Sequence, residues 1–367
     1  MNICCYISSH GFGHATRTFA ILKELTKKDI NIFIRANLPN WLIKNSFKDN
    51  NLKYINNFET LKVFHHSDKL TFEKIKTINY IKNYFLNYDE RIKKEIQFCK
   101  ENQIDLILSD IEPIAFEVAY ECEIDSIAIS NFTWFDIYRE ILINESKILE
   151  RIKNAYKKAS LLFRLPFHFE MSYFKEIIDV PLIFRKLTRS KREIKSILDL
   201  NSSDKLISIQ FGGHNFSFLK VWNNKIQKFH KKNPNIYFLI NRFSKGQILD
   251  SIRHIFKNIP AKDVETQDYI SISDLIIGKT GYSLVSEVVG YKTPFFYTIR
   301  EKWIEDKNLK IGIENYGIGK FYSRTDLING IWIDEISFGM NLKNTQPKKL
   351  IEKYGQDEIV KYILKRY

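Results

Sequence analysis

Each half of the chain contains a short apolar run that ends in a glycine-bearing loop and is followed by apolar residues at helical spacing. In the first half the run is 3–7 and the loop is 8–14. In the second half the run 206–210 precedes Gly212 and Gly213. Continuous apolar strands that alternate with helices are typical of parallel sheets covered on both faces. The chain is therefore predicted to be an α/β protein with two similar halves.

The length of the chain favours two domains. One hydrophobic core seldom grows beyond about 250 residues, and this chain has 367. A proline and a dense run of charges over 179–195 indicate the connection between the two cores. We therefore expect an N-terminal domain over 1–185, a C-terminal domain over 186–340 and a helical tail over 341–367 that could pack back on the first domain. The further strands expected are 30–34, 105–108, 126–129, 236–240, 275–277 and 294–298.

Composition excludes several classes of protein. Hydrophobic residues make up 44% and charged residues 27% of the chain, which is typical of a globular protein. No apolar stretch approaches the ~18 residues that span a bilayer, and the start lacks the pattern of a secretory leader, so we expect a cytoplasmic protein. The cysteines have neither disulfide nor metal-ligand spacing. The formal net charge of +14 either indicates an anionic partner or reflects a lysine-rich composition. The sequence contains no nucleic-acid-binding motif, so we do not expect nucleic acid as a partner.

Three glycine-bearing loops stand at the ends of predicted strands. They contain Gly11 and Gly13, Gly212 and Gly213, and the segment 278–281. A glycine between a strand and a helix lets backbone amides and the positive helix end face an anion. A tight turn alone also favours glycine, so one such loop indicates little. Three loops divided between two domains predict a phosphate-binding cleft.

Glu287 lies six residues after Gly281, in the helix predicted to follow the third loop. A diphosphate at the start of this helix would bring a ribose near the carboxylate, which can accept hydrogen bonds from both ribose hydroxyls. Lys279 in the same loop would offset the diphosphate charge. A single glutamate on a helix is by default exposed to solvent, so this prediction depends on the loop beside it.

His14 and Asp110 each follow a predicted strand, at the same edge of a parallel sheet. Imidazole is suited to take a proton from an attacking hydroxyl, and a carboxylate behind it fixes its tautomer. The pattern predicts a pair of His14 and Asp110, with helix capping or packing as the alternative role of His14. His10 and His214 lie on loops of the same kind, and no group of histidines has metal-ligand spacing.

Several strings of residues resemble one family, the glycosyltransferase-like domain that precedes the kinase in plant L-arabinokinase, together with its free-standing microbial relatives. The resemblance runs in order from the start of the chain to about residue 300. The segment 281–287 also resembles the donor-binding signature of the bacterial enzyme that adds N-acetylglucosamine to lipid I. The strings that carry the resemblance are Ser9 to Arg17, Ser109 to Pro113, Asn131 to Trp134, Phe163 to Pro166, Ile178 to Pro181 and Gly278 to Glu287.

This resemblance implies the GT-B fold, in which two Rossmann-like domains face each other across a cleft, and a UDP-sugar as donor. Plant small-molecule glycosyltransferases use a His-Asp dyad at positions that resemble His14 and Asp110. The loop with Gly11 and Gly13 resembles the glycine-rich loop of the lipid I enzyme. The donor-binding residues implied are Thr280, Gly281 and Tyr282 for the diphosphate, Glu287 for the ribose, and Gly212 and Gly213 closing over the phosphates.

The segment 300–306 departs from the family pattern. It lacks the Asp-Gln pair that many such enzymes use to hold the hydroxyls of the donor sugar. Glu305 or Asp306 is the expected substitute, and the donor sugar itself stays undetermined. No kinase motif is present, so arabinokinase activity is not expected.

We therefore expect an enzyme that transfers a hexosyl or N-acetylhexosaminyl group with inversion, with His14 as general base and Asp110 behind it. The expected partners are a nucleotide sugar and a hydroxyl acceptor, such as a sugar or a lipid-linked precursor of a cell-envelope glycan. No metal or separate cofactor is expected. The basic, aromatic stretch 69–100 predicts a solvated helix, with contact to an anionic membrane or an acceptor as the alternative. A nucleotide-sugar hydrolase, an epimerase and a non-catalytic nucleotide-sugar-binding protein are the other functions that fit the same motifs.

Overall fold

The computed structural model describes residues 1–47, 52–55, 58–65, 72–211, 219–240, 248–258, 265–342 and 354–367. The chain forms two compact units, each with a parallel sheet, so the α/β fold class is confirmed. Unit 1 comprises Met1–Phe184, Trp303–Asn308 and Glu352–Tyr367, and unit 2 comprises Arg185–Lys302 and Leu309–Ile351. The first division, between Phe184 and Arg185, falls one residue before the expected boundary between residues 185 and 186. The assignment of Trp303–Asn308 to unit 1 differs from the expectation of a continuous C-terminal domain over 186–340.

The sheet of unit 1 has seven parallel strands in the order β3-β2-β1-β4-β5-β6-β7. The order reverses between β1 and β4, which is the position where open α/β sheets bind ligands beyond the carboxyl ends of their strands. Both of these central strands are buried almost throughout, as the continuous apolar runs predict. The strands are β1 Asn2–Ile7, β2 Asn31–Arg35, β3 Leu52–Ile55, β4 Leu106–Asp110, β5 Asp125–Ser130, β6 Leu161–Arg164 and β7 Ile177–Asp179.

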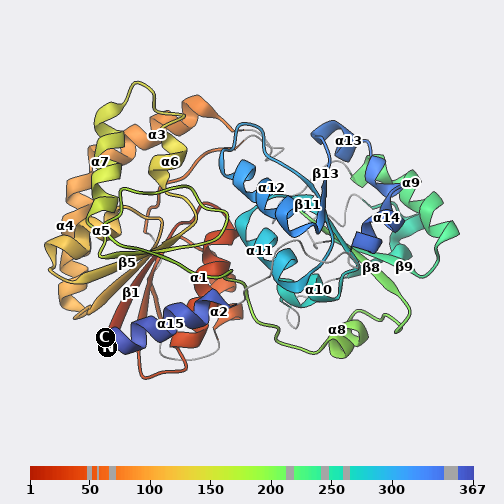
Figure 1. The fold of residues 1–367 in the computed structure, drawn as a ribbon, viewed down its shortest axis with the longest axis horizontal. Helices are drawn as coiled ribbons and strands as arrows, with labels where there is room; N and C mark the ends of the chain where they lie inside the picture. Colours follow the sequence, from red (N-terminus) through yellow and green to blue (C-terminus); the bar gives the residue numbers. More distant parts are fainter. Residues whose placement is uncertain are drawn as a thin grey trace. The chain divides into compact units, whose positions relative to one another are not determined.

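Helices cover both faces of this sheet (Figure 1). They bury aliphatic and aromatic side chains in one large core, in which Tyr84, Tyr88, Phe116 and Trp134 are among the largest fully enclosed side chains. The helices of unit 1 are α1 Phe12–Leu25, α2 Asn40–Ser46, α3 Lys74–Leu86, α4 Tyr88–Glu101, α5 Ile114–Glu121, α6 Trp134–Tyr138, α7 Ser146–Lys157 and α15 Gly355–Arg366.

The last helix, α15, belongs to unit 1 and lies beside α1, so that the two chain ends are close together (Figure 1). Gly355 donates its backbone N–H to the carbonyl of Leu182 at 2.9 Å. A Cβ at this position would lie 2.2 Å from the carbonyl oxygen of Pro181, so only glycine allows this approach. At the other end of the helix, the hydroxyl of Tyr367 donates to Asp125 at 2.8 Å.

The sheet of unit 2 has six parallel strands in the order β10-β9-β8-β11-β12-β13, and it repeats the reversal of order between β8 and β11. The strands are β8 Lys205–Gln210, β9 Ile236–Ile240, β10 Phe256–Asn258, β11 Leu275–Lys279, β12 Phe295–Thr298 and β13 Gly319–Phe321. The helices are α8 Lys191–Ile197, α9 Leu219–Lys232, α10 Thr266–Ile272, α11 Tyr282–Tyr291, α12 Glu305–Tyr316, α13 Arg324–Ile328 and α14 Ile336–Asn341, with 3-10 turns η2 Asp250–Ile255 and η3 Ile331–Ile333. The first residues of α12, up to Asn308, are counted with unit 1.

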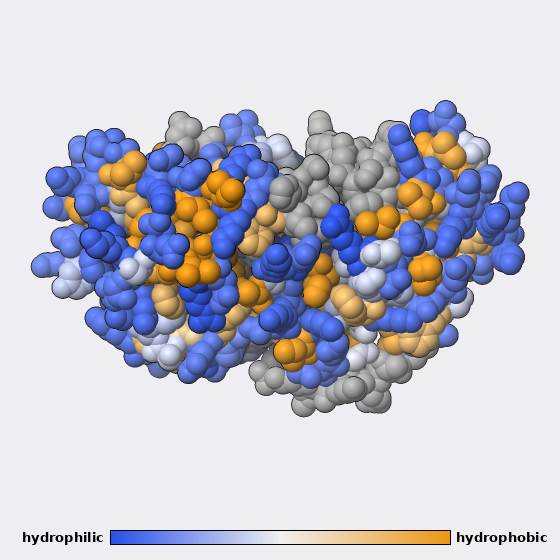
Figure 2. Space-filling model, turned by 90° about the horizontal axis from the view of Figure 1, so that it is seen from above, coloured by the Kyte–Doolittle hydropathy of each residue, from blue (hydrophilic) through white to orange (hydrophobic). Residues whose placement is uncertain are grey.

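Helices α3 and α4 both lie in the basic, aromatic stretch 69–100, and α3 is amphipathic. Its inner side buries Thr77, Ile81 and Tyr84. Ile75 and Leu86 are 77% and 78% exposed, and Figure 2, which looks onto this end of unit 1, shows hydrophobic side chains gathered there among hydrophilic ones. No helix in the described part of the chain is both long and apolar enough to cross a membrane.

Candidate active site

The loop after β1 brings α1 to the carboxyl edge of the unit 1 sheet. Gly11 has φ +86°, a backbone conformation that favours glycine, and its N–H donates to the carbonyl of Ser9 at 2.8 Å. Helix α1 then begins at Phe12, so His14 lies in its first turn. The register of the sheet pairs Ile7 at the end of β1 with Asp110 at the end of β4. The first turn of α1 is therefore built beside Asp110.

The structure brings His14 and Asp110 together. Nδ1 of His14 lies 2.7 Å from Oδ1 of Asp110. The histidine is 7% and the aspartate 1% exposed. The ring of Phe132 meets the imidazole edge to face at 5.8 Å between centroids. The geometry of the predicted pair is thus present, while its chemical role stays a prediction.

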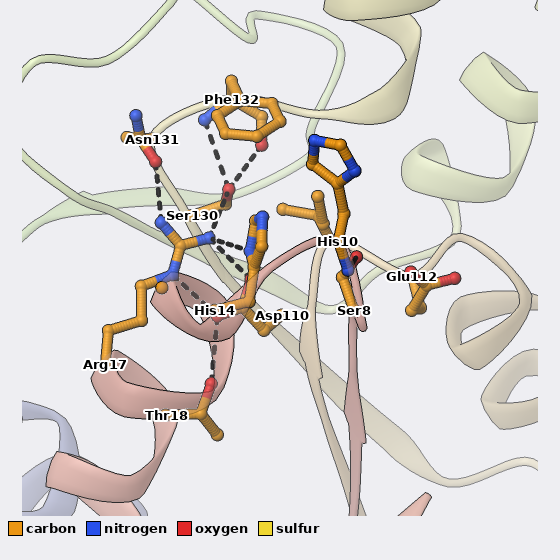
Figure 3. A network of polar contacts seen from close by, with 12 residues as sticks. Ser8, His10, His14, Arg17, Thr18, Asp110, Glu112, Ser130, Asn131 and Phe132 are labelled. Atoms are coloured by element: carbon orange, nitrogen blue, oxygen red, sulfur yellow. Dashed lines mark hydrogen bonds and ion pairs between the residues drawn. The ribbon is translucent and has the colours of Figure 1, made fainter. Parts of the chain in front are cut away.

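Arg17 is the principal cation beside Asp110, and the sequence analysis assigned it no role. Its Nε donates to Oδ2 and its NH2 to Oδ1 of Asp110, both at 2.6 Å. The hydroxyl of Thr18 also donates to Oδ2, at 2.9 Å. Figure 3 shows these donors converging on the carboxylate. Burial alone would raise the pKa of Asp110, but Arg17 and His14 hold it well below its usual range, so the carboxylate is a fixed anion.

Two groups compete for Nδ1 of His14. Asp110 Oδ1 lies 2.7 Å away and NH2 of Arg17 lies 3.0 Å away. An unprotonated Nδ1 would direct its lone pair at a carboxylate oxygen, which is repulsive at that distance. A protonated Nδ1 instead makes a charge-assisted hydrogen bond of ordinary length. The contacts therefore favour the tautomer with Nδ1–H, which leaves on Nε2 the lone pair that a general base needs.

The network continues from Arg17 to residues distant in the sequence. NH1 of Arg17 donates to Oδ1 of Asn131 at 2.7 Å, and Nδ2 of Asn131 donates to Oε1 of Glu305 at 3.1 Å. The second carboxylate oxygen of Glu305 accepts from Nε1 of Trp303 at 2.9 Å. Glu305 is buried within unit 1. Glu305 thus lies in unit 1, and not in a continuous C-terminal domain over 186–340, because the chain returns to unit 1 over Trp303–Asn308.

Glu112 is a second buried carboxyl group beside this network, two residues after Asp110. Nε1 of Trp134 and the backbone N–H of Leu61 donate to it, each at 3.3 Å. Burial raises the pKa of Glu112 to about 8, although these donors and the hydroxyl of Ser8 oppose the rise. Figure 3 shows Glu112 on the far side of Ser8 and His10 from the Arg17 cluster. The sequence offered no sign of this group beyond its place in a motif.

His10 stacks within an aromatic group rather than beside Asp110. Its ring lies 5.3 Å from that of Trp303, with 24° between the planes, and meets Trp134 edge to face. Its Nδ1 accepts the backbone N–H of Val63 at 3.3 Å. This contact favours the tautomer with Nε2–H, which is the opposite of that inferred for His14. The two histidines of the loop are therefore not interchangeable.

The predicted diphosphate site of unit 2 lies where β11 ends and α11 begins. Gly278 and Lys279 belong to the strand, and Gly278 is required there because a Cβ would lie 2.2 Å from the carbonyl oxygen of Gln210. Gly281 precedes the helix, and a Cβ there would meet nothing within 4 Å. Thr280 is buried and donates its backbone N–H to Thr298 at 2.9 Å. Among the described residues, the Cβ position of Gly281 at the helix start thus faces open space, while Tyr282 packs inward.

Glu287 lies on α11 and is 3% exposed. Nε of Arg185 donates to its Oε1 at 2.8 Å, and the same arginine approaches Glu265 at 3.8 Å. Burial raises the pKa of Glu287, and Arg185 only partly opposes this. The sequence analysis read Arg185 as part of the interdomain connection, so this ion pair was missed. The role of Glu287 as a ribose ligand stays a prediction.

The other residues named from the sequence are Gly13, Gly212, Gly213 and His214. Gly212, Gly213 and His214 lie outside the described residues. Gly13 is exposed and lies in the first turn of α1. Among the residues that the structure describes, no group of three or more His, Cys, Asp or Glu side chains is placed to hold a metal ion.

Comparison with known proteins gives the fold its name. No protein-family model matches the chain. Over 343 residues, or 92% of its length, the chain is 27% identical to L-arabinokinase of Arabidopsis thaliana, of which it spans 32%. This match confirms the resemblance stated from the motifs. The chain thus spans about a third of the length of that relative.

Solved structures cover the whole chain. A UDP-glucosyltransferase from Polygonum tinctorium, capable of glucosylating indoxyl, matches with a TM-score of 0.61 and 12% identity, over 99% of this chain and 98% of that one. TcCGT1 in complex with UDP matches with a TM-score of 0.65 and 14% identity, over 100% and 99% of the two chains. These matches establish the fold, which is GT-B.

Proposed function

We propose that this protein is an inverting glycosyltransferase that moves a sugar from a UDP-sugar to the hydroxyl group of an acceptor. The observation that carries the proposal is the 2.7 Å contact between His14 and Asp110, which leaves Nε2 of His14 with a free lone pair. The carboxylate orients the ring and compensates the charge of the imidazolium that forms. A base of this kind at the carboxyl edge of an α/β sheet suits the activation of a hydroxyl nucleophile.

The donor is assigned to unit 2. The start of α11 supplies backbone amides and the positive end of a helix dipole, and the space in front of Gly281 admits a diphosphate. Lys279 adds a positive charge at the end of β11. Glu287 is assigned to the ribose hydroxyls. The UDP in the complex of TcCGT1, which shares the fold, supports UDP as the nucleotide.

The proposed step exchanges one bond at the anomeric carbon for another and moves one proton. The acceptor oxygen attacks the anomeric carbon, and the bond from that carbon to the diphosphate oxygen breaks. The acceptor's proton moves to Nε2 of His14, and UDP leaves with the electron pair of the broken bond. The helix start and Lys279 stabilise the charge that grows on the diphosphate. Attack from the side opposite the leaving group inverts the anomeric configuration.

Binding of nucleotides tests the donor assignment first. Calorimetric titration with UDP, GDP, CDP and dTDP should show that UDP binds most tightly, and titration with UDP-glucose and UDP-N-acetylglucosamine then separates hexosyl from N-acetylhexosaminyl transfer. A chain that binds none of the four nucleoside diphosphates would refute the proposal. Gly281→Val, which fills the space before α11, is the matched variant and should abolish binding of UDP.

Product analysis separates transfer from related reactions. A transferase releases UDP from its UDP-sugar only when an acceptor hydroxyl is supplied. Release of UDP and free sugar at the same rate without acceptor would identify a hydrolase, and a change of configuration without loss of UDP would identify an epimerase. Binding of UDP without any turnover would identify a nucleotide-sugar-binding protein.

The acceptor is proposed from the surface of unit 1. Ile75 and Leu86 at the two ends of α3 and Ile143 after α6 are largely exposed, and Lys74, Lys76 and Lys82 lie on the same helix. Apolar side chains among lysines suit a membrane with anionic lipids, so we propose a lipid-linked acceptor. Sedimentation with vesicles that contain phosphatidylglycerol should retain the protein, whereas Ile75→Ser with Leu86→Ser should release it. Equal binding of both forms would contradict this assignment.

A further inference from the structure

The polar network around Asp110 extends well beyond the pair that the proposed function uses. Asp110 receives hydrogen bonds from His14, from two nitrogens of Arg17 and from Thr18. Arg17 is joined to Asn131, and Asn131 to Glu305. All of these side chains are buried. Burying so many charged and polar groups costs free energy unless each is satisfied, which raises the question of what the network does.

We propose that Arg17, Asn131 and Glu305 are positioning residues that hold the Asp110 carboxylate in the one orientation that fixes the tautomer and direction of the His14 ring. The inference rests on the proposed function, because it names how the base of that reaction is aligned. It also gives Glu305 a role different from contact with the donor sugar. None of the three residues touches the reacting atoms in this account.

The guanidinium of Arg17 holds the plane of the Asp110 carboxylate. Nε and NH2 of Arg17 make two parallel bonds of 2.6 Å to the two oxygens of Asp110. A two-pronged contact fixes the plane of the carboxylate, whereas a single contact allows rotation about the Cβ–Cγ bond. With the plane fixed, Oδ1 faces Nδ1 of His14 at 2.7 Å. Arg17 thereby decides where the histidine can donate.

The amide of Asn131 is held in one direction. Its oxygen accepts from Arg17 and its nitrogen donates to Glu305. In the reverse orientation, the amide nitrogen of Asn131 would face the guanidinium of Arg17, and its oxygen would face the carboxylate of Glu305. Each neighbour therefore selects the same orientation, and the amide transmits the constraint between two buried charges.

Glu305 is the next link of the network after Asn131. Its two carboxylate oxygens accept from Asn131 at 3.1 Å and from Trp303 at 2.9 Å. The side chain is only 4% exposed. Asn308, in the same segment, donates to the carbonyl of His168 at 2.9 Å and holds Trp303–Asn308 in unit 1. These contacts suit a residue that supports Asn131 and Arg17 from behind.

Nuclear magnetic resonance of the full chain, labelled with ¹⁵N-histidine, tests the proposal without any substrate. His14→Gln identifies the signals of His14. In the wild type, Nδ1 should carry the proton, and that proton should exchange slowly because it is buried against Asp110. In Arg17→Lys, which keeps the charge but cannot make two parallel bonds, the Nδ1–H signal should be lost to exchange or give way to a mixture of tautomers.

Turnover provides the second readout. It is measured with the UDP-sugar that the calorimetric titration identifies as the donor. Arg17→Lys should lower kcat by about 10²-fold, as small misplacements of a reacting group do, while UDP binds with unchanged affinity. In Glu305→Gln the amide NH2 faces either Asn131 or Trp303, both of which are hydrogen-bond donors. The resulting displacement of Asn131 should lower kcat by about tenfold. In Glu305→Gln, the affinity for UDP-glucose should change no more than the affinity for UDP.

A matched control comes from a second, half-buried arginine in unit 1. Arg35 also makes a two-pronged contact, with Glu95, and lies outside the network. Arg35→Lys and Glu95→Gln should leave the His14 signals unchanged, which separates alignment of His14 from a general loss of packing. Should Arg17→Lys not fold, Asn131→Ala removes the contact that supports Arg17 from behind and leaves Arg17 and Asp110 in place, and it should disturb the His14 signals as well.

Two results would overturn the proposal. One is a His14 tautomer and exchange rate that stay as in the wild type when Arg17 or Asn131 is replaced. The other is a loss of affinity for UDP-glucose, but not for UDP, in Glu305→Gln with unchanged His14 signals, which would return Glu305 to the donor sugar. If the chain transferred no sugar at all, the resonance experiment would still decide the alignment of His14, so the two failures are distinguishable.

Discussion

In both units an arginine pairs with a buried carboxylate that the proposed function uses, yet the pKa values of the two carboxyl groups shift in opposite directions. Arg17 reaches Asp110 with two nitrogens at 2.6 Å, and His14 and Thr18 add further donors. The pKa of Asp110 falls well below its usual range. Arg185 reaches Glu287 with Nε at 2.8 Å and lies near Glu265 as well. The pKa of Glu287 is raised.

The difference shows that one neighbouring cation does not by itself lower the pKa of a buried carboxyl group. Burial penalises the charged form in both units, and the outcome depends on how many donors reach the oxygens. Glu112 extends the series, since an indole, a hydroxyl and a backbone N–H donate to it rather than an arginine, and its pKa rises to about 8. Asp110 is thus a permanent anion behind a base, whereas Glu287 and Glu112 are held less firmly in charged form.

The largest effect is expected for Asp110→Asn. An amide in this place can direct NH2 or oxygen at His14, so the Nδ1–H tautomer is no longer enforced and Arg17 loses its anion. By analogy with the loss of the aspartate from a catalytic triad, turnover should fall by about 10³ to 10⁴-fold. UDP affinity should stay unchanged, as measured by calorimetry on the same preparation. Turnover within tenfold of the wild type would show that the carboxylate does not orient the base.

The second effect concerns the pH dependence of stability, in which Glu112, with its raised pKa, should differ from Asp110, with its lowered pKa. With a folded pKa of about 8 and an unfolded pKa of about 4.3, the folded state binds the extra proton between these values, so stability should fall as the pH rises from about 5 to about 8. The slope approaches 1.4 kcal/mol per pH unit, or about 4 kcal/mol in total. Glu112→Gln cannot ionise and should flatten this dependence in urea unfolding.

The control for this comparison is Glu121→Gln, at an exposed position of α5. It should leave the pH dependence of the wild type intact. A wild-type stability that stays level from pH 5 to pH 8 would contradict the assignment of a protonated Glu112.

A smaller effect is expected in unit 2. Glu287→Gln removes one charged acceptor for the ribose hydroxyls and should weaken UDP binding by about tenfold, the scale of one hydrogen bond to a charged group. Arg185→Gln should weaken it as well if the ion pair holds Glu287 in place. Tighter binding in Arg185→Gln would show instead that the arginine competes with the ribose. Glu314→Gln, at an exposed position of α12, should bind UDP as the wild type does.

The smallest effect is expected for Thr18→Val. This change removes one of four hydrogen bonds to Asp110 and keeps the shape of the side chain. Because Arg17 still fixes the plane of the carboxylate, turnover should fall by less than about tenfold. Thr16→Val, on the exposed side of α1, is the matched control. A loss as large as that of Asp110→Asn would mean that Thr18, and not Arg17, controls the carboxylate.

The sequence predicted the contacts that follow from strand register. His14 and Asp110 come after two strands whose ends must meet at one edge of a parallel sheet, and the structure places them 2.7 Å apart. The alternation of strands and helices likewise predicted both sheets. These features depend on local patterns, which a single sequence contains.

The sequence did not reveal the partners of the two carboxylates. Arg17 lies three residues after His14 and so shares its helix face, but the pattern does not tell which strand end that face meets. Arg185 lies in a run of charges that is also typical of a connection between domains. Glu305 and Asn131 are separated by 174 residues, and their contact depends on the return of the chain to unit 1. Such contacts follow from tertiary packing and leave no local signal.

The most direct test of this account compares His14→Asn with the wild type in two measurements on the same protein. Calorimetry should give UDP affinities that agree within about twofold, since His14 has no part in donor binding here, while release of UDP from the UDP-sugar with acceptor present should fall by at least about 10³-fold. A variant that still turns over within tenfold of the wild type would show that His14 is not the base.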